Sequence, residues 1–543
     1  MTKLARMSAY ASAAALALAL AACGPDEPGE GPRTAVSEAQ MEEGLDALGF
    51  ARSDLFASAE AEMEDGVAVY TGLTSADGEA PGRVGRLSIA APRVEDGVAR
   101  FDWLEAEDLL AGGEDGEGGE GVARIARLRA DRPGAALSQL ISDLINGRAD
   151  EDDYELPSRA AADYTFAELS MSGLSFTADG GDEAPVGGAL ARAALEAFDG
   201  ERLGRAVIEG LSITGDDEDA GELVMRLDEF SMTGLDALFI DVLLNIEDEG
   251  EDGAIAMGDQ FSEAMTRWMR PTGAFESLAM RGMEVRAGGA RIAMPTLDMR
   301  YETRRDDTID IIAEMPQLTV ALSSDTPETA QGAQMLASMG YEMLEFSLYS
   351  RTRYNPATDR ATVALEDYWF ELKDGLRISL AQDVSGLQAY ADQTAAVMSE
   401  MFAQIEADPD GAAGELPEAV EMRLMEAYGA LQIHSMTLRI DDLNLLERAM
   451  TLNAQMQGVT PEEARMQAAT MMGLGIAMGG GMLPEGLAIE MGAALSAFIN
   501  QGGAVEIAMA PAAPVGMDRL MNVAEDMSVI ADLGLSVRHI PAE

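Results

Sequence analysis

The stretch Leu169-Ser170-Met171-Ser172-Gly173 decides the fold, because it alternates apolar with small residues and ends in glycine. Such alternation places the apolar side chains on one face of a β-strand, and the glycine allows the strand to bend or turn. The same phrase recurs at residues 211–215, 230–234 and 278–282. The irregular spacing of the copies argues against a solenoid of fixed period and favours a long antiparallel sheet with helical insertions.

A hairpin and meander in the second half of the chain give the clearest strand prediction. Residues 346–354 lead into Asn355-Pro356-Ala357-Thr358-Asp359, and residues 361–365 return from it. Asn, Pro and Asp are typical of turns between paired strands. Apolar alternation continues through residues 368–370 and 376–380, so we expect neighbouring antiparallel strands here.

Helices are predicted where start signals precede apolar residues at helical spacing. Ser37-Glu38-Ala39-Gln40 resembles a capping box and predicts a helix that runs to about Glu64, and Pro133 opens a second helix. After Tyr390 the pattern is mainly helical, with a strong helix start at Thr460-Pro461-Glu462-Glu463.

We therefore predict an α+β protein with a large, mostly antiparallel twisted sheet and a smaller C-terminal mixed α/β domain. The strand-rich domain with helical insertions is expected at residues 37–388. A helix-rich domain with short strands is expected at residues 389–543.

The first 22 residues have the pattern of a secretory signal. Lys3 and Arg6 precede a run to Ala22 that contains no acid and is rich in Ala and Leu. The apolar part of this run, residues 13–22, is about half as long as the roughly 20 residues that a spanning helix needs. We predict that residues 1–22 are cleaved and that residues 23–36, which are rich in Gly, Pro and acids at their start, form a disordered tether.

The junction resembles the lipobox of bacterial lipoproteins, which Leu20, Ala21, Ala22 and Cys23 match residue by residue. The resemblance implies that Cys23 is lipidated and that the acyl chains anchor the protein durably. Gly24 follows the cysteine where an Asp would imply retention at the inner membrane, so the resemblance implies the periplasmic face of the outer membrane. The alternative is an ordinary cleaved signal followed by an unpaired thiol. Cys23 is the single cysteine, so we expect no disulfide.

Charge limits the partners of the chain. The net charge is −59, and removal of Lys3 and Arg6 with the leader takes it to −61. This sign excludes nucleic acid as a partner, because nucleic-acid binding requires basic surfaces. An anionic membrane surface also repels such a body, so membrane attachment is expected to come from the acyl anchor.

Long sheets of alternating, glycine-punctuated strands resemble those of AsmA-type envelope proteins, which line an apolar groove associated with lipid movement. Together with the lipobox, this resemblance implies a lipid-anchored envelope protein that acts in binding or as a scaffold and handles lipid. The expected partners are the membrane, through the anchor, and an envelope protein or lipid.

No catalytic, cofactor or metal site is predicted from the residues. His434 and His539 lie on predicted strands without a nucleophile motif nearby, and the stretch around Ser212 lacks the last glycine of a nucleophile elbow. The acidic runs at 151–153, 216–219 and 247–252 do not match the spacing of a calcium loop. An envelope hydrolase that uses paired carboxylates is the alternative function, but 96 acids single out no pair.

The methionines of the helix that follows Thr460 admit three interpretations. Thioethers bind copper(I), but Met more often fills gaps in a core. The helix and the one after it, at 487–499, are low in charge and suit contact with acyl chains as well. We predict that these methionines pack in a core against the sheet; they are Met466, Met471, Met472, Met478 and Met482.

Overall fold

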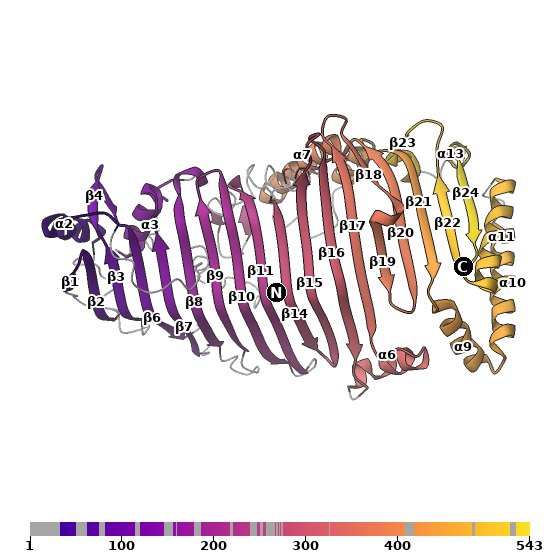
Figure 1. Ribbon diagram of the computed structural model, residues 1–543, viewed down its shortest axis with the longest axis horizontal. Helices are drawn as coiled ribbons and strands as arrows, with labels where there is room; N and C mark the ends of the chain where they lie inside the picture. The colour runs from indigo at the N-terminus through magenta and orange to yellow at the C-terminus, as the bar shows by residue number, and fades with distance from the viewer. Residues whose placement is uncertain are drawn as a thin grey trace. The chain divides into compact units, whose positions relative to one another are not determined.

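A computed structural model of the protein describes most of the chain beyond residue 32 (Figure 1). The described residues are 33–49, 62–74, 82–114, 120–145, 156–158, 160–178, 186–217, 221–238, 247–249, 254–256, 267, 270, 272, 275–324, 326–407, 418–479, 484–521 and 528–542. Among them, twenty strands form antiparallel sheet and two small hairpins stand apart. No helix in these ranges has the length and apolar character needed to cross a membrane.

The chain divides into two compact units. Unit 1 comprises Met1–Ala256 and Ala274–Gly288, and unit 2 comprises Met257–Gly273 and Gly289–Glu543. The predicted α+β class with a dominant antiparallel sheet is confirmed. The predicted division between residues 388 and 389 lies inside unit 2, where helix α7 (Leu387–Ala407) begins.

In unit 1, each strand pairs antiparallel with its neighbours in chain order, so the sheet is a simple meander. Its strands are β1 (Glu62–Glu64), β2 (Val67–Thr74), β3 (Arg83–Ala90), β6 (Trp103–Glu114), β7 (Glu120–Asp131), β8 (Phe166–Ala178), β9 (Val186–Phe198), β10 (Arg202–Asp217), β11 (Gly221–Asp236) and β14 (Ser277–Ala287). The two hairpins are β4 (Arg93–Glu95) with β5 (Val98–Arg100), and β12 (Glu247–Glu249) with β13 (Ala254–Ala256).

Two helices cover the start of this sheet. Helix α2 (Glu38–Leu48) begins with the predicted capping box at Ser37, and helix α3 (Ala135–Ile145) follows Pro133. Their apolar side chains join those of β2, β3 and β8 in one buried cluster, which includes Leu48, Ile89 and Leu169. The prediction that the first helix runs to about Glu64 is wrong, since α2 ends at Leu48, where Gly49 adopts the left-handed conformation, and residues 62–64 form β1.

The glycine of the recurring phrase has a conformational role. Gly173 and Gly282 have φ angles of 64° and 62°, in the left-handed region that only glycine enters without strain. They belong to a row of positions that crosses the sheet from strand to strand. In this row a residue with positive φ on one strand faces a residue, mostly a small one, on the next strand. The members with positive φ are Gly72, Asp108, Gly173, Gly210 and Gly282, and the facing residues are Gly85, Ala126, Ala191 and Asp228.

A second row lies six residues away along each strand, as from Gly210 to Gly204. In this second row, the residues with positive φ lie in, or directly after, the strands that have no positive φ in the first row. They are Ala91, Arg132, Ala197 and Gly234. The pairings skip these positions without a change of register. Strands β2, β6, β8, β9, β10, β11 and β14 therefore each contain one left-handed residue, and Ala91 and Arg132 directly follow the ends of β3 and β7.

The left-handed residue changes which face of the strand the following side chains point to. Residues three apart on a regular strand point to opposite faces. Across the first row, however, Met171 and Leu174 of β8, and Ile208 and Leu211 of β10, pack in one cluster. The phrase therefore encodes apolar residues on both sides of a kink that face the same way.

In unit 2 the meander predicted from the Asn355 turn is confirmed. Strand β17 pairs with β16, and on its other side with β18 and β19, which both pair with β20; β21, β22 and β24 follow. The strands are β15 (Ala290–Thr303), β16 (Ile309–Leu322), β17 (Leu344–Asn355), β18 (Arg360–Val363), β19 (Tyr368–Leu372), β20 (Leu376–Ser385), β21 (Gln432–Asp442), β22 (Ala504–Met509), β23 (Val515–Gly516) and β24 (Leu535–Ile540).

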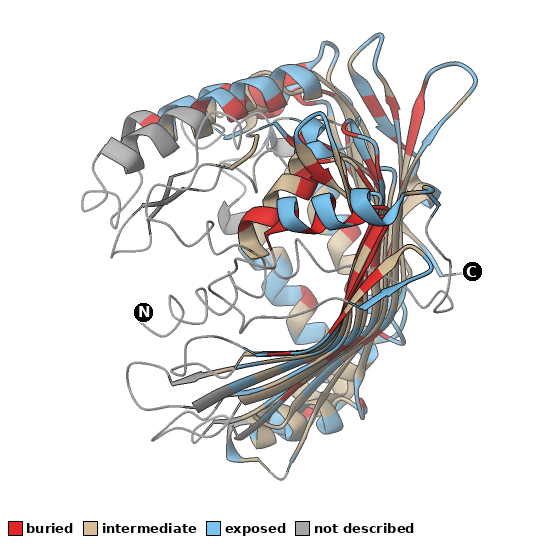
Figure 2. Cartoon of the chain, turned by 90° about the vertical axis from the view of Figure 1, so that its left-hand side faces the viewer, coloured by how far each residue is buried: buried red, intermediate tan, exposed pale blue. Residues whose placement is uncertain are grey.

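Helices of unit 2 pack in small groups. Helix α7 packs on α8 (Glu418–Tyr428), and α9 (Leu445–Gln457) packs on α10 (Pro461–Gly479). Helix α10 packs on α11 (Glu485–Gln501), which in turn packs on β22 and β24. The others are α6 (Pro327–Ser338), α12 (Met517–Met521) and α13 (Ser528–Asp532). Figure 2 shows that exposed positions gather on loops and outer helix surfaces, whereas the strands are mainly buried or half-buried.

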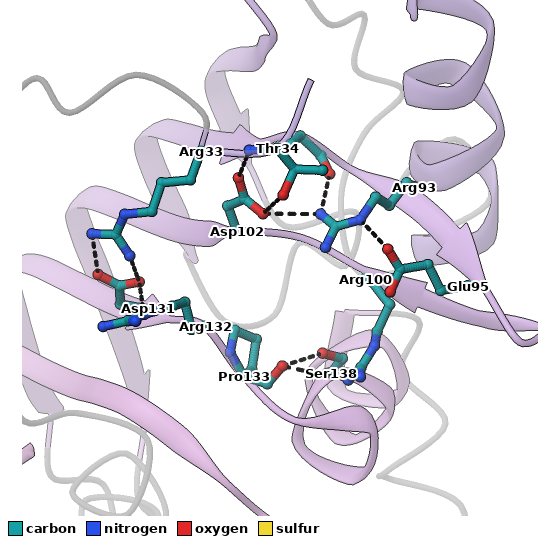
Figure 3. Close-up of polar contacts among 11 residues, drawn as sticks. Arg33, Thr34, Arg93, Glu95, Arg100, Asp102, Asp131, Arg132, Pro133 and Ser138 are labelled. Carbon is teal, nitrogen blue, oxygen red and sulfur yellow. Dashed lines mark hydrogen bonds and ion pairs between the residues drawn. The ribbon is translucent and has the colours of Figure 1, made fainter. Parts of the chain in front are cut away.

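The start of the described chain is held on unit 1 by two buried carboxylates (Figure 3). Asp102 accepts hydrogen bonds from the backbone N–H of Thr34 at 2.6 Å and from its hydroxyl at 2.7 Å. Arg93 pairs with the same carboxylate at 3.0 Å, and Arg33 pairs with Asp131 at 3.0 Å. The last residues of the predicted tether, Arg33 to Val36, are therefore fixed on unit 1, and the prediction that the tether is disordered as far as residue 36 is wrong.

Candidate apolar binding surface

One face of the unit 2 sheet is apolar and only half-buried. The register of β16, β17, β19, β20 and β21 places side chains from all five strands on this face, because paired residues in antiparallel strands point the same way. None of them belongs to the buried core. They are Met315, Leu318, Phe346, Leu348, Phe370, Leu372, Leu376, Ile378, Leu380, Leu438 and Ile440. We call this set the apolar face of unit 2.

Aromatic rings lie within this face. Phe346 and Phe370 stack with ring centroids 5.5 Å apart and an interplanar angle of 18°. Leu348 and Ile378 pair with Phe370 from the two neighbouring strands. The alternation of these strands thus creates a continuous apolar surface that β-branched, aliphatic and aromatic side chains share.

The unit 2 sheet is covered at its β22–β24 side and at the ends of strands β16 and β17 where Ile309 and Tyr354 lie, in contrast to the apolar face. At β22 and β24, Val505 and Val537 are buried with Ala494 of α11. Near β17, Tyr354 is buried with Ile309 and Ala361 and packs against Leu387 at the start of α7. The half-buried residues lie between these covered ends within unit 2.

The opposite face of the same strands is polar. Trp369 stacks on Tyr349 with centroids 6.2 Å apart, and the Arg377 guanidinium lies 4.5 Å from the Trp369 ring centroid. Ion pairs such as that of Arg439 with Asp441, at 2.6 Å, occupy much of this face. The sheet therefore separates a charged surface from an apolar one.

The predicted core packing of the α10 methionines is wrong. Met466 is 60% exposed, Met471 73% and Met472 42%. Helix α10 contacts its neighbours through small residues, such as the buried Ala464 and Ala469, so its larger side chains point outward. The side chains of Met478 and Met482 lie outside the described residues.

The sequence-predicted lipidation site, Cys23, also lies outside the described residues, together with Leu20, Ala21 and Ala22. The acidic run at 151–153 is likewise outside them. Of the other two acidic runs, residues 216–217 end β10 and residues 247–249 form β12, which are strands rather than loops. Within the described ranges, no group of three or more His, Cys, Asp or Glu residues has the arrangement of a metal site.

Most buried carboxylates in the described chain pair with arginine, whereas Asp143 accepts a hydrogen bond from Gln139 at 2.8 Å. Glu105 pairs with Arg127 and Arg129, and Glu506 pairs with Arg538. Burial by itself raises the pKa of the Asp102 carboxyl, but hydrogen bonds from Thr34 and the charge of Arg93 outweigh it and the net pKa is lowered. A general acid needs a raised pKa, so Asp102 does not suit that role. Glu105 and Glu506 face arginine in their printed ion pairs rather than a second carboxylate, so they do not favour the hydrolase.

A serine–histidine contact was missed by sequence reasoning. The Ser385 hydroxyl lies 2.9 Å from Nε2 of His434, because β20 and β21 bring these distant residues together beside a register shift. A nucleophilic serine needs a histidine oriented by a third group. Asp383 is the nearby carboxylate, but Arg360 holds both of its oxygens. The contact therefore joins two strands and lacks the geometry of a catalytic triad.

A family model described as "Uncharacterized protein" matches residues 369–540, which extend from β19 to β24 in unit 2. No curated protein and no solved structure matches the chain.

Proposed function

We propose that this protein is a lipid-anchored envelope lipoprotein that binds acyl chains on the apolar face of unit 2. The carrying observation is the row of half-buried apolar side chains from β16 to β21, backed by a charged face on the other side of the same strands. At about 25 cal/mol per Å² of apolar surface removed from water, covering such a face is favourable. Acyl chains have the chemistry to cover it without leaving polar groups unpaired.

The anchor supports the proposal by bringing the protein to lipid. About ten residues separate Cys23 from Arg33, and at full extension they span roughly 35 Å. Arg33 and Thr34 are fixed on unit 1 by Asp131 and Asp102. A lipidated Cys23 would hold the body within that distance of the membrane surface.

The acyl-chain proposal is tested with two adjacent substitutions on opposite faces of β17. Leu348→Gln places an amide on the apolar face, whereas Ser347→Gln places the same amide on the polar face. We expect a fluorescent fatty acid to bind the wild type and Ser347→Gln equally and Leu348→Gln at least about tenfold more weakly, because an unpaired polar group there costs more than about 1 kcal/mol. Equal binding by both variants would exclude this face as the binding surface.

The anchor and its location are tested separately. Cys23→Ser is expected to release the protein from membranes into the soluble fraction, and continued tight association would contradict the lipobox interpretation.

Gly24→Asp is expected to move the protein from outer to inner membrane fractions in a density gradient. Unchanged fractionation would contradict the proposed periplasmic face of the outer membrane.

A further inference from the structure

Three arginines surround one buried carboxylate in unit 2. The Asp310 side chain is 2% exposed and lies at the start of β16. Arg304 donates to its Oδ2 from Nε at 2.8 Å and Nη2 at 2.6 Å, and Arg351 donates to the same oxygen at 3.2 Å and 2.6 Å. Arg353 donates from Nε to Oδ1 at 3.4 Å. These residues form the Asp310 cluster.

The cluster holds more positive charge than its carboxylate neutralises. Burial raises the pKa of Asp310, but the hydrogen bonds and charges of Arg304 and Arg351 outweigh it, so the pKa is lowered and the group is ionised. Three guanidinium groups on one carboxylate leave two positive charges in excess. In a chain with a net charge of −59, such a local excess is unusual.

Among the described residues, the neighbouring acids pair with other groups rather than with Arg304, Arg351 or Arg353. Glu302 and Glu314 both pair with Arg300, at 2.8 Å and 3.1 Å. Asp383 is held by Arg360. Asp306 accepts from Thr308, and its charge acts on Arg304 only through space, as that of Asp367 does on Arg351.

The cluster also keeps hydrogen-bond donors available. An arginine has five N–H donors in a fixed fork. Arg353 is 50% exposed and uses only Nε toward Asp310, so within the described part of the chain both of its terminal nitrogens remain available. Arg304 and Arg351 are 37% and 33% exposed and each has one terminal nitrogen that Asp310 does not use.

We propose that the Asp310 cluster binds a phosphate group. A dianionic tetrahedral oxyanion matches the excess of two charges, and arginine forks suit the geometry of phosphate oxygens. Arg353 is the principal ligand, and the unused N–H groups of Arg304 and Arg351 complete the site. Asp310 positions the arginines. The phosphate belongs either to a free anion or to a lipid headgroup.

The experiment titrates the full-length protein with inorganic phosphate by calorimetry, with ionic strength held constant by chloride. We expect binding to the wild type with a dissociation constant on the order of 1 mM, since the acidic body opposes anions. Arg353→Gln is expected to weaken it at least about tenfold, the loss of a hydrogen bond to a charged group. Arg286→Gln is the control, because Arg286 is also half-exposed, at 49%, and pairs with Glu284 in unit 1.

Absence of phosphate binding by the wild type, or equal weakening by both variants, would overturn the proposal. Circular dichroism of Arg353→Gln checks that the variant folds, which we expect because the Arg304 and Arg351 pairs remain.

The second arm of the experiment titrates the protein with dihexanoyl phosphatidic acid. Tighter binding of this lipid than of phosphate, again dependent on Arg353, assigns the site to a headgroup, and equal binding assigns it to a free anion. Arg353 lies on the face opposite Leu348, so failure of this site leaves the acyl-chain proposal intact.

Discussion

The two units are built from the same kind of sheet but use its apolar face differently. In unit 1, α2 and α3 cover the first strands, and Leu48, Ile89 and Leu169 are at most 2% exposed. In unit 2, the corresponding side chains between the covered ends, such as Leu348 and Phe370, are half-buried. Alternation alone therefore produces an apolar face, and only the covering helices decide whether that face is a core or a surface.

The units also differ in how their strands change the face to which alternate side chains point. Unit 1 uses left-handed kinks in two rows, with pairing preserved on both sides. Unit 2 uses register shifts, as between Met315 and Leu318 of β16 and between Asp383 and Val384 of β20. Such shifts bend a single strand locally and change the direction of its side chains. The left-handed residues of unit 1 recur on successive strands, so they change the direction of side chains across the sheet.

The largest expected effect comes from matched leucine truncations in the two units. Leu169→Ala removes a side chain that is 2% exposed, and a buried Leu→Ala change costs about 3 kcal/mol. Leu348→Ala removes a half-buried side chain and is expected to cost about 1 kcal/mol. Urea unfolding followed by circular dichroism measures both. Equal losses would show that the apolar face of unit 2 is a core as well.

A glycine pair tests the kinks. Gly173→Val forces a β-branched residue to a φ of 64° and places its Cβ 2.6 Å from that of Ala126, so we expect a loss of about 2–3 kcal/mol. Gly215 ends another copy of the phrase, but its nearest neighbour for an added Cβ is Val186 at 3.5 Å. Gly215→Val is therefore expected to cost less than about 1 kcal/mol. Equal effects on the unfolding midpoint would refute the special role of the kinks.

Sequence reasoning predicted the phrase strands, the Asn355 meander and the start of α10 at Thr460, because each depends on local alternation, turn or capping chemistry. Strand β9 shows the limit: Val186–Phe198 is rich in Ala, Leu, Arg and Glu, which favour helix. It forms a strand because β8 and β10 pair with it on both sides.

The sites were harder to predict than the strands. Alternation gave the apolar face of unit 2, but its exposure depends on which helices pack on it, and no local pattern encodes that. The Asp310 cluster joins residues more than forty positions apart, Asp310 to Arg351 and Arg353, and only the register of β16 and β17 brings them together. The α10 methionines misled the prediction because small residues such as Ala464 and Ala469 form buried contacts of this helix, whereas Met466, Met471 and Met472 are exposed.

The pH dependence of unit 1 tests Asp102, one of the two carboxylates that hold its start. The lowered pKa of Asp102 means that its ionised form stabilises the fold. This contribution is complete above the unfolded value of about 3.9 and is lost as the pH falls through the lower folded pKa. Asp102→Asn is expected to cost about 1–2 kcal/mol at pH 7, with the difference from wild type shrinking below about pH 4. A difference that stays constant down to pH 2 would contradict this role of the charge.

The smallest expected effect is that of an exposed methionine, which we compare with a buried one. Met171 is 1% exposed in unit 1, whereas Met471 is 73% exposed on α10 in unit 2. Met471→Ser is therefore expected to change the free energy of unfolding by no more than about 0.5 kcal/mol, as exposed substitutions do, whereas Met171→Ser should cost several times more. Thermal unfolding of the two variants measures this difference. A large loss for Met471→Ser would mean that a further layer covers α10, and the contrast between the covered first strands of unit 1 and the half-buried apolar face of unit 2 would then be reduced.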